Sequence, residues 1–289
     1  MKFYNSKELL ALCKMHHMTI GEVMLEREMM LFHIDKETAM NKMGHAYDIM
    51  KNAAKRALNE DLKSMGGLIG GESKQIYASA NKHSVCGELI SKGISYAVGV
   101  LEVNSSMGLI VAAPTAGSSG VIPGAFLTLQ EHFHLSDEEM IMGLFTAGAI
   151  GYLITYNATV SGAEGGCQAE VGAASAMAAA AVVEMRKGTL EQSLDAAATA
   201  ITNILGLVCD PIAGLVEAPC QKRNAMGVAN ALISAEMALC GIKHLVPFDE
   251  TVEAMYKVGR NMPSELRETA LGGMAATPTG CQLCKGILG

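Results

Sequence analysis

Apolar residues recur along this chain at intervals of three and four positions, the spacing that lines one face of an α-helix. After Asp35, one such stripe runs through Met40, Met43, Tyr47, Met50, Ala54, Ala57 and Leu58. A second helix is expected to begin at Thr189, which forms a capping box with Gln192. Its apolar stripe is Leu190, Leu194, Ile201, Leu205 and Val208. Asp210-Pro211 is expected to end this helix.

A third helix is predicted after Ser136 and Glu139, which form another capping box. The following residues 140–156 include no charged side chain but three glycines. A helix that is apolar all round is either a core helix or a membrane span, and a span needs about 20 apolar residues. Because this run is slightly shorter, we expect a core helix. Further helices are predicted over residues 172–187, 222–240 and 250–260.

These patterns predict an all-α protein. We expect a single large helical domain over residues 1–289, with the apolar helix buried at its centre and a loop-like tail over residues 272–289. The composition agrees, because the chain has 20 Met and no Trp, and unbranched side chains favour helices over strands. Hydrophobic residues make up 50% and charged residues 18% of the chain, against roughly 25% charged in ordinary soluble domains. Either the core is large or partners cover much of the surface.

The charge balance excludes two classes of partner. A net charge of -7 and a pI near 5.6 give no attraction to nucleic acid or to an anionic membrane, so neither is expected. The first ten residues, MKFYNSKELL, show no apolar core or cleavage site of a secretory signal, and a cytoplasmic protein is therefore expected. In that compartment the eight cysteines are expected to be reduced thiols.

Three stretches rich in Gly, Ser, Thr and Pro interrupt the helices and are the candidate active loops: residues 104–124, 159–166 and 210–219. Within the first, residues 113–120 (APTAGSSG) combine glycine-freed amides with three hydroxyls, which suits a carboxylate or phosphate ligand. The alternative is a tight connection between two buried helices.

Two nucleotide-binding motifs can be set aside. Residues 66–74 (GGLIGGESK) only superficially resemble a phosphate loop, because Glu72 stands where that motif needs Lys. No GxGxxG follows a predicted strand, so a dinucleotide site has no support. A flexible connection is the better interpretation of residues 66–74.

The cysteines fall into three groups. Cys167, Cys209 and Cys220 each lie in or beside a glycine- or proline-bearing loop, where a thiolate can face a metal, although their spacing matches no short zinc or ferredoxin motif. Cys281 and Cys284 form a C-x-x-C pair, which permits redox chemistry or metal binding, or else belongs to a mobile tail. The others are expected to be packing residues or inert thiols: Cys13, Cys86 and Cys240.

Longer segments resemble the iron–sulfur-dependent L-serine dehydratases over nearly the whole chain: residues 102–108, 111–120, 161–172, 206–220, 223–225 and 268–280. The resemblance implies a lyase that converts L-serine to pyruvate and ammonia, a step of amino-acid degradation that feeds gluconeogenesis. It also implies that Cys167, Cys209 and Cys220 hold an oxygen-sensitive [4Fe–4S] cluster, rather than pyridoxal phosphate. One iron of that cluster has no protein thiolate.

In such an enzyme the open iron acts as a Lewis acid on the β-hydroxyl of serine, which otherwise leaves poorly. The elimination product, aminoacrylate, tautomerises and hydrolyses to pyruvate and ammonia. The general base is unknown from this chain. The substrate carboxylate is expected to be bound by donors from three segments: Asn104, Ser105, Ser106, Met107, Thr115, Gly117, Ser118, Ser119, Gly120, Arg223 and Asn224.

The chain departs from its single-chain relatives at both ends. Those relatives carry an added amino-terminal domain with a Gly-Pro-Ser-Ser-Ser-His-Thr loop, which is not found here. This chain therefore resembles the alpha chain of the two-chain form, and a beta chain is its expected partner in a hetero-oligomer. The relatives also end in a cysteine that caps the open iron, whereas this chain ends in Gly289. Cys281 or Cys284 is a candidate replacement as fourth ligand.

Two other functions stay open. A pyridoxal-phosphate dehydratase needs a Schiff-base lysine beside a glycine-rich phosphate cup, and Lys74 after Gly70-Gly71 is the nearest approach, without the surrounding pattern. A non-catalytic helical assembly chain would bury its apolar surface against partners, which the low charge content favours.

Overall fold

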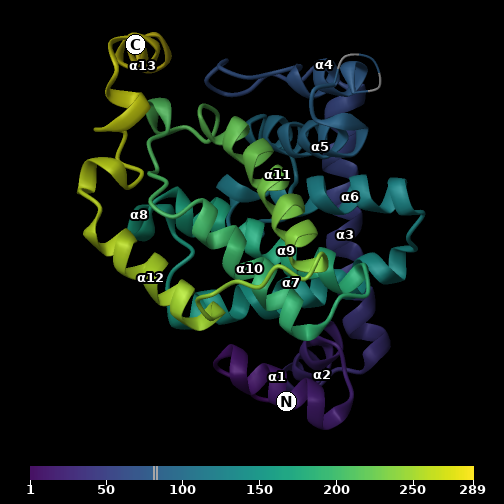
Figure 1. Cartoon of the computed structure of the whole chain (residues 1–289). Helices are drawn as coiled ribbons and strands as arrows, with labels where there is room; N and C mark the ends of the chain where they lie inside the picture. The colour runs from purple at the N-terminus through teal and green to yellow at the C-terminus, as the bar shows by residue number, and fades with distance from the viewer. Residues whose placement is uncertain (81, 83) are drawn as a thin grey trace.

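The computed structural model describes residues 1–80, 82 and 84–289. Over these residues the chain forms thirteen α-helices joined by short turns, with no β-strand, which confirms the predicted all-α class (Figure 1). The helices are α1 (Ser6–His16), α2 (Ile20–Phe32), α3 (Lys36–Asn59), α4 (Glu72–Ser79), α5 (Gly87–Ser105), α6 (Val121–Phe133), α7 (Asp137–Asn157), α8 (Gly162–Gly165), α9 (Ala173–Met185), α10 (Leu190–Asn203), α11 (Cys220–Leu239), α12 (Phe248–Asn261) and α13 (Pro278–Leu288).

Helix α9 occupies the centre of the molecule. Every residue of α9 except Glu184 is buried, and α6, α7, α10 and α11 pack around it (Figure 1). Its alanines leave the neighbouring backbones free to approach, and the contacts that replace water there stabilise the helix. The prediction placed the central helix at residues 140–156, within α7. A buried central helix exists, but it is α9.

Helix α7 lies beside α9 and is the one helix in the described part of the chain that is long and apolar enough to cross a membrane. Within this fold 61% of its apolar window is buried, against α2, α3 and α9. The core helix of a folded domain meets the same length and composition test. The packing of α7 is therefore that of a core helix, as its short apolar run predicted.

The helix starts match the sequence signals closely. Ser136 begins α7 and Thr189 begins α10, each with the predicted capping box, and the side chain of Asp35 accepts a hydrogen bond from the first turn of α3. Helices α9, α11 and α12 lie within a few residues of their predicted ranges. Helix α10 ends at Asn203, earlier than predicted, because Gly206 turns the chain with a φ of +87°.

The prediction of a loop-like tail over residues 272–289 is wrong for most of that segment. Residues Gly273–Ala276 form a 3-10 turn and Pro278–Leu288 form α13. The Thr277 side chain accepts a hydrogen bond from the Gly280 amide at 3.0 Å, and Pro278 fills the first helical position, where its missing N–H has no consequence. Helix α13 packs against the turn Ile212–Gly214, so the tail docks on the loop that joins Cys209 to Cys220.

The glycine-rich loops are shorter than predicted. Residues 104–124 include the end of α5 and the start of α6, with the 3-10 turn Ala116–Ser118 between them. In the segment 66–74, the amides of Gly66 and Leu68 donate to the Glu217 carboxylate at 2.6 and 3.0 Å. The Glu217 carboxylate thus accepts hydrogen bonds from amides of the kind that bind a phosphate.

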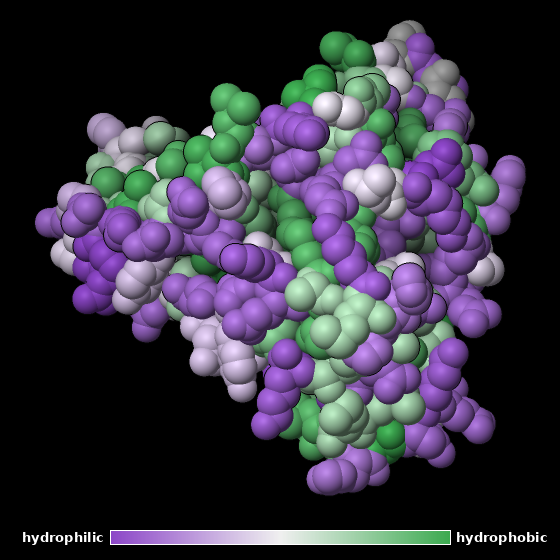
Figure 2. Space-filling view, turned by 60° about the horizontal axis from the view of Figure 1, so that its bottom comes forward, coloured by the Kyte–Doolittle hydropathy of each residue, from purple (hydrophilic) through white to green (hydrophobic). Residues whose placement is uncertain are grey.

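The low charge content reflects both the core and the surface. On the face shown in Figure 2, hydrophilic residues surround a narrower band of hydrophobic ones. Large apolar side chains are exposed on several elements, including Met30, Leu31 and Phe32 at the end of α2 and Met107 and Leu109 after α5. A large core therefore coexists with exposed apolar side chains, and coverage of those side chains by a partner stays a prediction.

Candidate active site

Three loops bring Cys167, Cys209 and Cys220 together beside the amino-terminal end of α9. Cys167 precedes a π-helical turn (Gln168–Gly172) that leads into α9, Cys209 follows α10, and Cys220 begins α11. All three are free thiols with exposed fractions of 3%, 4% and 7%. They lie within electrostatic range of one another, as the sequence interpretation requires.

The loop that carries Cys209 is fixed from two sides. Arg223 of α11 donates to the Val208 carbonyl at 2.7 Å and pairs with the buried Asp210 carboxylate at 2.7 Å. The other Asp210 oxygen accepts the Met274 amide of the carboxyl-terminal segment at 2.6 Å. These bonds hold the backbone on both sides of Cys209 and do not involve its thiol.

Backbone pairing adds to this support. The Cys209 amide donates to the Leu266 carbonyl at 2.9 Å, and the Glu268 amide donates to the Cys209 carbonyl at 2.7 Å. The amide of Gln168, next to Cys167, donates to the Leu207 carbonyl at 3.0 Å, and its side chain bonds the Gly206 amide at 2.9 Å. The segments that carry Cys167 and Cys209 therefore hold each other in place.

The donor set fits a multi-iron cluster. Burial raises the pKa of Cys167 and Cys220 to about 12 and that of Cys209 further, so the thiols are neutral until a metal compensates their charge. In the described part of the chain, no three His, Cys, Asp or Glu side chains are close enough to hold a single ion. Soft thiolates are the preferred ligands of an iron–sulfur cluster, which is bound through one thiolate per iron.

Glu170, which the sequence interpretation passed over, joins the cysteines to the predicted substrate loop. Its Oε1 accepts a hydrogen bond from the Thr115 hydroxyl at 2.7 Å, and its Oε2 lies 3.6 Å from the Cys209 sulfur. Burial raises the pKa of this carboxyl. The available signal was an acidic residue three positions after Cys167 in an otherwise uncharged helix start.

The predicted substrate loop, Thr115 to Gly120, is rigidly packed. Ser118 and Ser119 are buried, and their hydroxyls bond within the turn: Ser119 donates to the Ala116 carbonyl at 2.8 Å, and the Ser118 hydroxyl lies 3.2 Å from that of Thr115. These contacts fix the turn, so only Thr115 directs a hydroxyl to Glu170.

Asn224 of α11 clamps the same loop. Its side chain donates to the Gly117 carbonyl at 2.7 Å and accepts from the Gly120 amide at 3.0 Å. Together with Arg223, it belongs to the scaffold that positions the loops. The structure thus brings both residues to the site, while their contact with substrate stays a prediction.

Asn104, Ser105, Ser106 and Met107 lie at the end of α5. The Ser105 and Ser106 hydroxyls donate to carbonyls of α5 itself, at 2.8 and 2.7 Å. Met107 is exposed, with a φ of +60°. A substrate contact for this segment remains a prediction.

The other cysteines have different surroundings. Cys13 is buried in α1, as expected, whereas Cys86 and Cys240 are exposed at helix ends and are not packing residues. Cys281 is exposed, with its thiol 3.7 Å from the Ala275 carbonyl, and Cys284 is half-buried. The docking of α13 keeps this pair near the Cys209–Cys220 loop, but ligation of iron by either is still only predicted.

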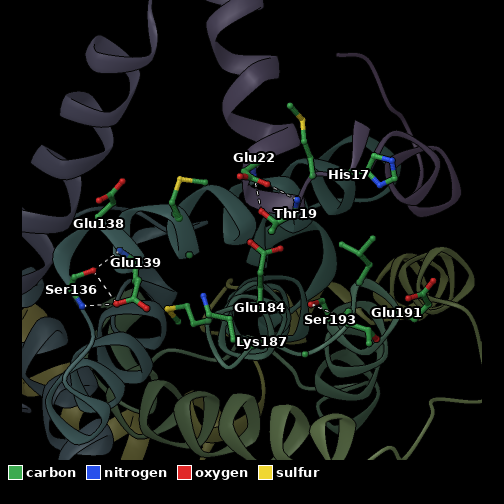
Figure 3. Close-up of a pocket in the computed structure, with 17 residues that line it drawn as sticks. His17, Thr19, Glu22, Ser136, Glu138, Glu139, Glu184, Lys187, Glu191 and Ser193 are labelled. Atoms are coloured by element: carbon green, nitrogen blue, oxygen red, sulfur yellow. Dashed lines mark hydrogen bonds between the residues drawn. The ribbon is translucent and has the colours of Figure 1, made fainter. Parts of the chain in front are cut away.

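A large cavity lies elsewhere. It has a volume of about 760 Å³ and is lined by residues around the carboxyl-terminal end of α9 (Figure 3). Helix α9 rises about 1.5 Å per residue, so this cavity is on the order of 20 Å from the cysteines. Figure 3 shows Glu184 pointing toward Thr19, and its carboxylate accepts the Ile20 amide at 2.8 Å. The Glu184 carboxylate thus bonds the start of α2. The candidate active site is at the opposite end of α9, beside the cysteines.

Comparisons with known proteins agree with this geometry. The family described as "Serine dehydratase alpha chain" matches residues 15–275. The chain is 51% identical over 289 residues to the "Probable L-serine dehydratase, alpha chain" of Bacillus subtilis (strain 168), covering 99% of this chain and 96% of that protein. It is 46% identical over 284 residues to the "L-serine dehydratase, alpha chain" of Peptoniphilus asaccharolyticus, covering 98% and 97%.

A longer relative matches over the same region. The "L-serine dehydratase" of Helicobacter pylori is 38% identical over 286 residues, which cover 95% of this chain but 62% of that protein. The remaining part of that protein has no counterpart in this alignment. Since the family match spans most of the chain and two relatives align over nearly their whole length, the chain belongs to the serine dehydratase alpha chain family.

Proposed function

We propose that this chain is the catalytic alpha chain of an L-serine dehydratase, a lyase that converts L-serine to pyruvate and ammonia. The observation that carries the proposal is the convergence of three buried thiols beside Glu170 and the loop Thr115 to Gly120. The names of the similar proteins from Bacillus subtilis and Peptoniphilus asaccharolyticus support it.

The proposed cofactor is a [4Fe–4S] cluster held by Cys167, Cys209 and Cys220. When bound, such a cluster supplies a Lewis-acidic iron that stabilises the hydroxide leaving serine. Arg223 offsets negative charge on the thiolates, because its guanidinium acts electrostatically on Cys167 and Cys220. The surrounding loops exclude bulk water from all three sulfurs, which strengthens these charge interactions.

The substrate carboxylate is proposed to bind the segments Asn104 to Met107 and Thr115 to Gly120. Asn224 holds the second segment in one conformation, and Thr115 joins it to Glu170. Fixing the carboxylate in this way orients the α-carbon for loss of its proton. The proposed partner is a beta chain, since two relatives are named alpha chains and a longer relative extends beyond the shared region.

Reconstitution tests the proposal. The chain, a beta chain and their mixture are loaded anaerobically with iron and sulfide, then assayed for bound iron, visible absorption and pyruvate formation from L-serine. We expect iron–sulfide absorption in the alpha chain and turnover in the mixture. Cluster-free protein with no turnover in any sample would instead favour the assembly-chain alternative, which the exposed apolar side chains support.

Exposure to air provides a second test. An iron that is open to serine is also open to oxygen, so we expect turnover and visible absorption to decay together after aeration. Unchanged turnover and absorption after a day in air would contradict the open-iron mechanism. We place the enzyme in the cytoplasm, where reductants protect its free cysteines.

The pyridoxal-phosphate alternative finds little support in the geometry. Lys74 pairs with the exposed Asp61 at 2.5 Å, and neighbouring loop amides are bonded to Glu217. A Schiff-base lysine needs a free amine beside open phosphate donors. The absorption spectrum separates the two cofactors, because an aldimine gives a sharper band than an iron–sulfur cluster.

A further inference from the structure

Buried carboxylates in this protein are generally supplied with several donors. Glu217 accepts three hydrogen bonds, from the Ser64 hydroxyl at 2.7 Å and from the amides of Gly66 and Leu68 at 2.6 and 3.0 Å. Glu184 also accepts three, from the Thr146 hydroxyl and from the amides of Ile20 and Gly21. Such donors replace the water that a carboxylate loses on burial.

Glu170 is the exception. Within the described residues, the Thr115 hydroxyl is its one oxygen or nitrogen donor, and the Cys209 thiol at 3.6 Å is a weak one. Ligation of metal by Cys209 removes that thiol proton. Arg223 bonds Asp210 and the Val208 carbonyl rather than Glu170. The Oε2 atom therefore faces the cysteine centre without a strong donor.

The chain makes room for this carboxylate. A Cβ atom added at Gly162 would lie 2.5 Å from Oε2, and one added at Gly117 would lie 3.0 Å from Oε1. Two glycines from two different loops are thus needed for Glu170 to occupy its position. A carboxylate so placed, between the predicted substrate loop and Cys209, is suited to a small ligand with several donors.

We propose that Glu170 binds the α-ammonium group of the substrate amino acid. An ammonium group brings three N–H donors, which the Glu170 site lacks, and a positive charge that attracts the carboxylate. The inference rests on the proposed function, which makes the substrate an amino acid. Serine then places its carboxylate at the loop Thr115 to Gly120, its ammonium at Glu170 and its β-hydroxyl toward the cysteines. Glu170 is then the residue that distinguishes serine from a hydroxy acid of similar shape that lacks the amino group.

The test compares L-serine with 3-hydroxypropanoate, which is serine with hydrogen in place of the amino group. The KM for serine and the inhibition constant of 3-hydroxypropanoate are measured with the anaerobically loaded complex of alpha and beta chains. Glu170→Gln keeps the size of the side chain and removes its charge. We expect the variant to raise the KM for serine about 10- to 100-fold, the scale of one lost charge-assisted bond. Inhibition by 3-hydroxypropanoate should stay near its wild-type value.

Glu184→Gln is the matched control, because it changes the same residue type, also bonded to buried groups, at the other end of α9. We expect it to leave both constants unchanged. Bound iron and visible absorption are measured for each variant, and the expected result is an intact cluster in both.

Three outcomes would overturn the proposal. Equal weakening of both ligands by Glu170→Gln would make Glu170 a positioning residue for the loop. An unchanged serine KM with lower turnover would assign it to the chemical step. If the variant fails to hold iron, the affinities of the wild-type complex for serine and for 3-hydroxypropanoate decide instead. Equal affinities would mean that no group in the site recognises the ammonium. A wild-type complex with a cluster but no serine turnover contradicts the proposed function instead.

Discussion

The two ends of α9 each lie beside a buried thiol and a carboxylate, in different surroundings. Cys167 and Glu170 lie at the amino-terminal end, and Cys13 and Glu184 lie at the carboxyl-terminal end. Burial raises the pKa of both thiols to about 12. Burial and a shifted pKa therefore do not distinguish the candidate active site from a structural one.

Hydrogen-bond partners make the distinction. At the carboxyl-terminal end, capped helix starts supply the carboxylates with donors, and Glu184 is satisfied by α2 and α7. At the amino-terminal end, loops bond to each other through Arg223 and Asn224, and one Glu170 oxygen has only the weak Cys209 thiol as a donor. The cavity of about 760 Å³ is at the carboxyl-terminal end (Figure 3). The candidate active site is therefore assigned from hydrogen-bond partners and not from the presence of a cavity.

The largest expected contrast between the ends is in iron binding. Cys167→Ser, Cys209→Ser and Cys220→Ser should each abolish cluster binding and turnover, because a hydroxyl is a poor replacement for a soft thiolate. Cys13→Ser and Cys240→Ser should retain both. Iron per chain and visible absorption after anaerobic loading provide the measurement. Full iron content in any of the first three variants would remove that residue from the ligand set.

A smaller effect is expected from the serine-rich turn. Replacing Ser118 and Ser119 together with Ala should weaken serine binding several-fold to about a hundredfold, with the cluster intact, if each lost bond is worth roughly 1.5–3 kcal/mol. Because both hydroxyls bond inside the turn, the lower end of that range is expected. Steady-state kinetics measure the change. Normal kinetics would show that the turn is only a helix connection and would move carboxylate binding to other residues.

At the opposite end, a change should affect stability alone. Glu184→Gln weakens the bonds to the amides of Ile20 and Gly21, which should lower the free energy of unfolding by about 1–3 kcal/mol. Thermal unfolding of the alpha chain measures this loss. An altered serine KM with unaltered stability would reverse the roles assigned to the two ends.

The smallest effect concerns Glu102, another buried carboxyl, which accepts the Ser73 amide at 3.0 Å. Burial, with the nearby Glu72 carboxyl, raises the pKa of Glu102 to about 7, so the folded chain keeps a proton that the unfolded chain releases near pH 4.5. The resulting stability is lost as the pH rises through about 7. Melting temperatures should fall between pH 6 and 8, and less so in Glu102→Gln. An equal fall in both proteins would contradict this assignment.

Local signals predicted much of the fold. The capping boxes at Ser136 and Thr189 place two helix starts correctly, because a cap depends on residues three positions apart. Helix α13 was missed because its glycines and Pro278 indicate a loop by composition, whereas Thr277 and Pro278 together form a helix start. The prominence of α9 depends on packing by four other helices, which no local pattern contains.

The site was predictable only in part. Motif resemblance pointed to Cys167, Cys209 and Cys220, and the fold brings them together. The bond between Thr115 and Glu170 joins residues 55 positions apart, so the sequence gives no direct sign of it. Likewise, the hydroxyls of Ser118 and Ser119 look available in the sequence, but the turn uses them.

The enclosure of α9 has a consequence for hydrogen–deuterium exchange. Its amides have no route to solvent through local fraying, because the helix is buried on all sides by its neighbours. Their exchange should require opening of the whole domain, so their protection factors should report the global free energy of unfolding. Amide exchange in α9 therefore measures the global stability of the intact alpha chain without denaturant.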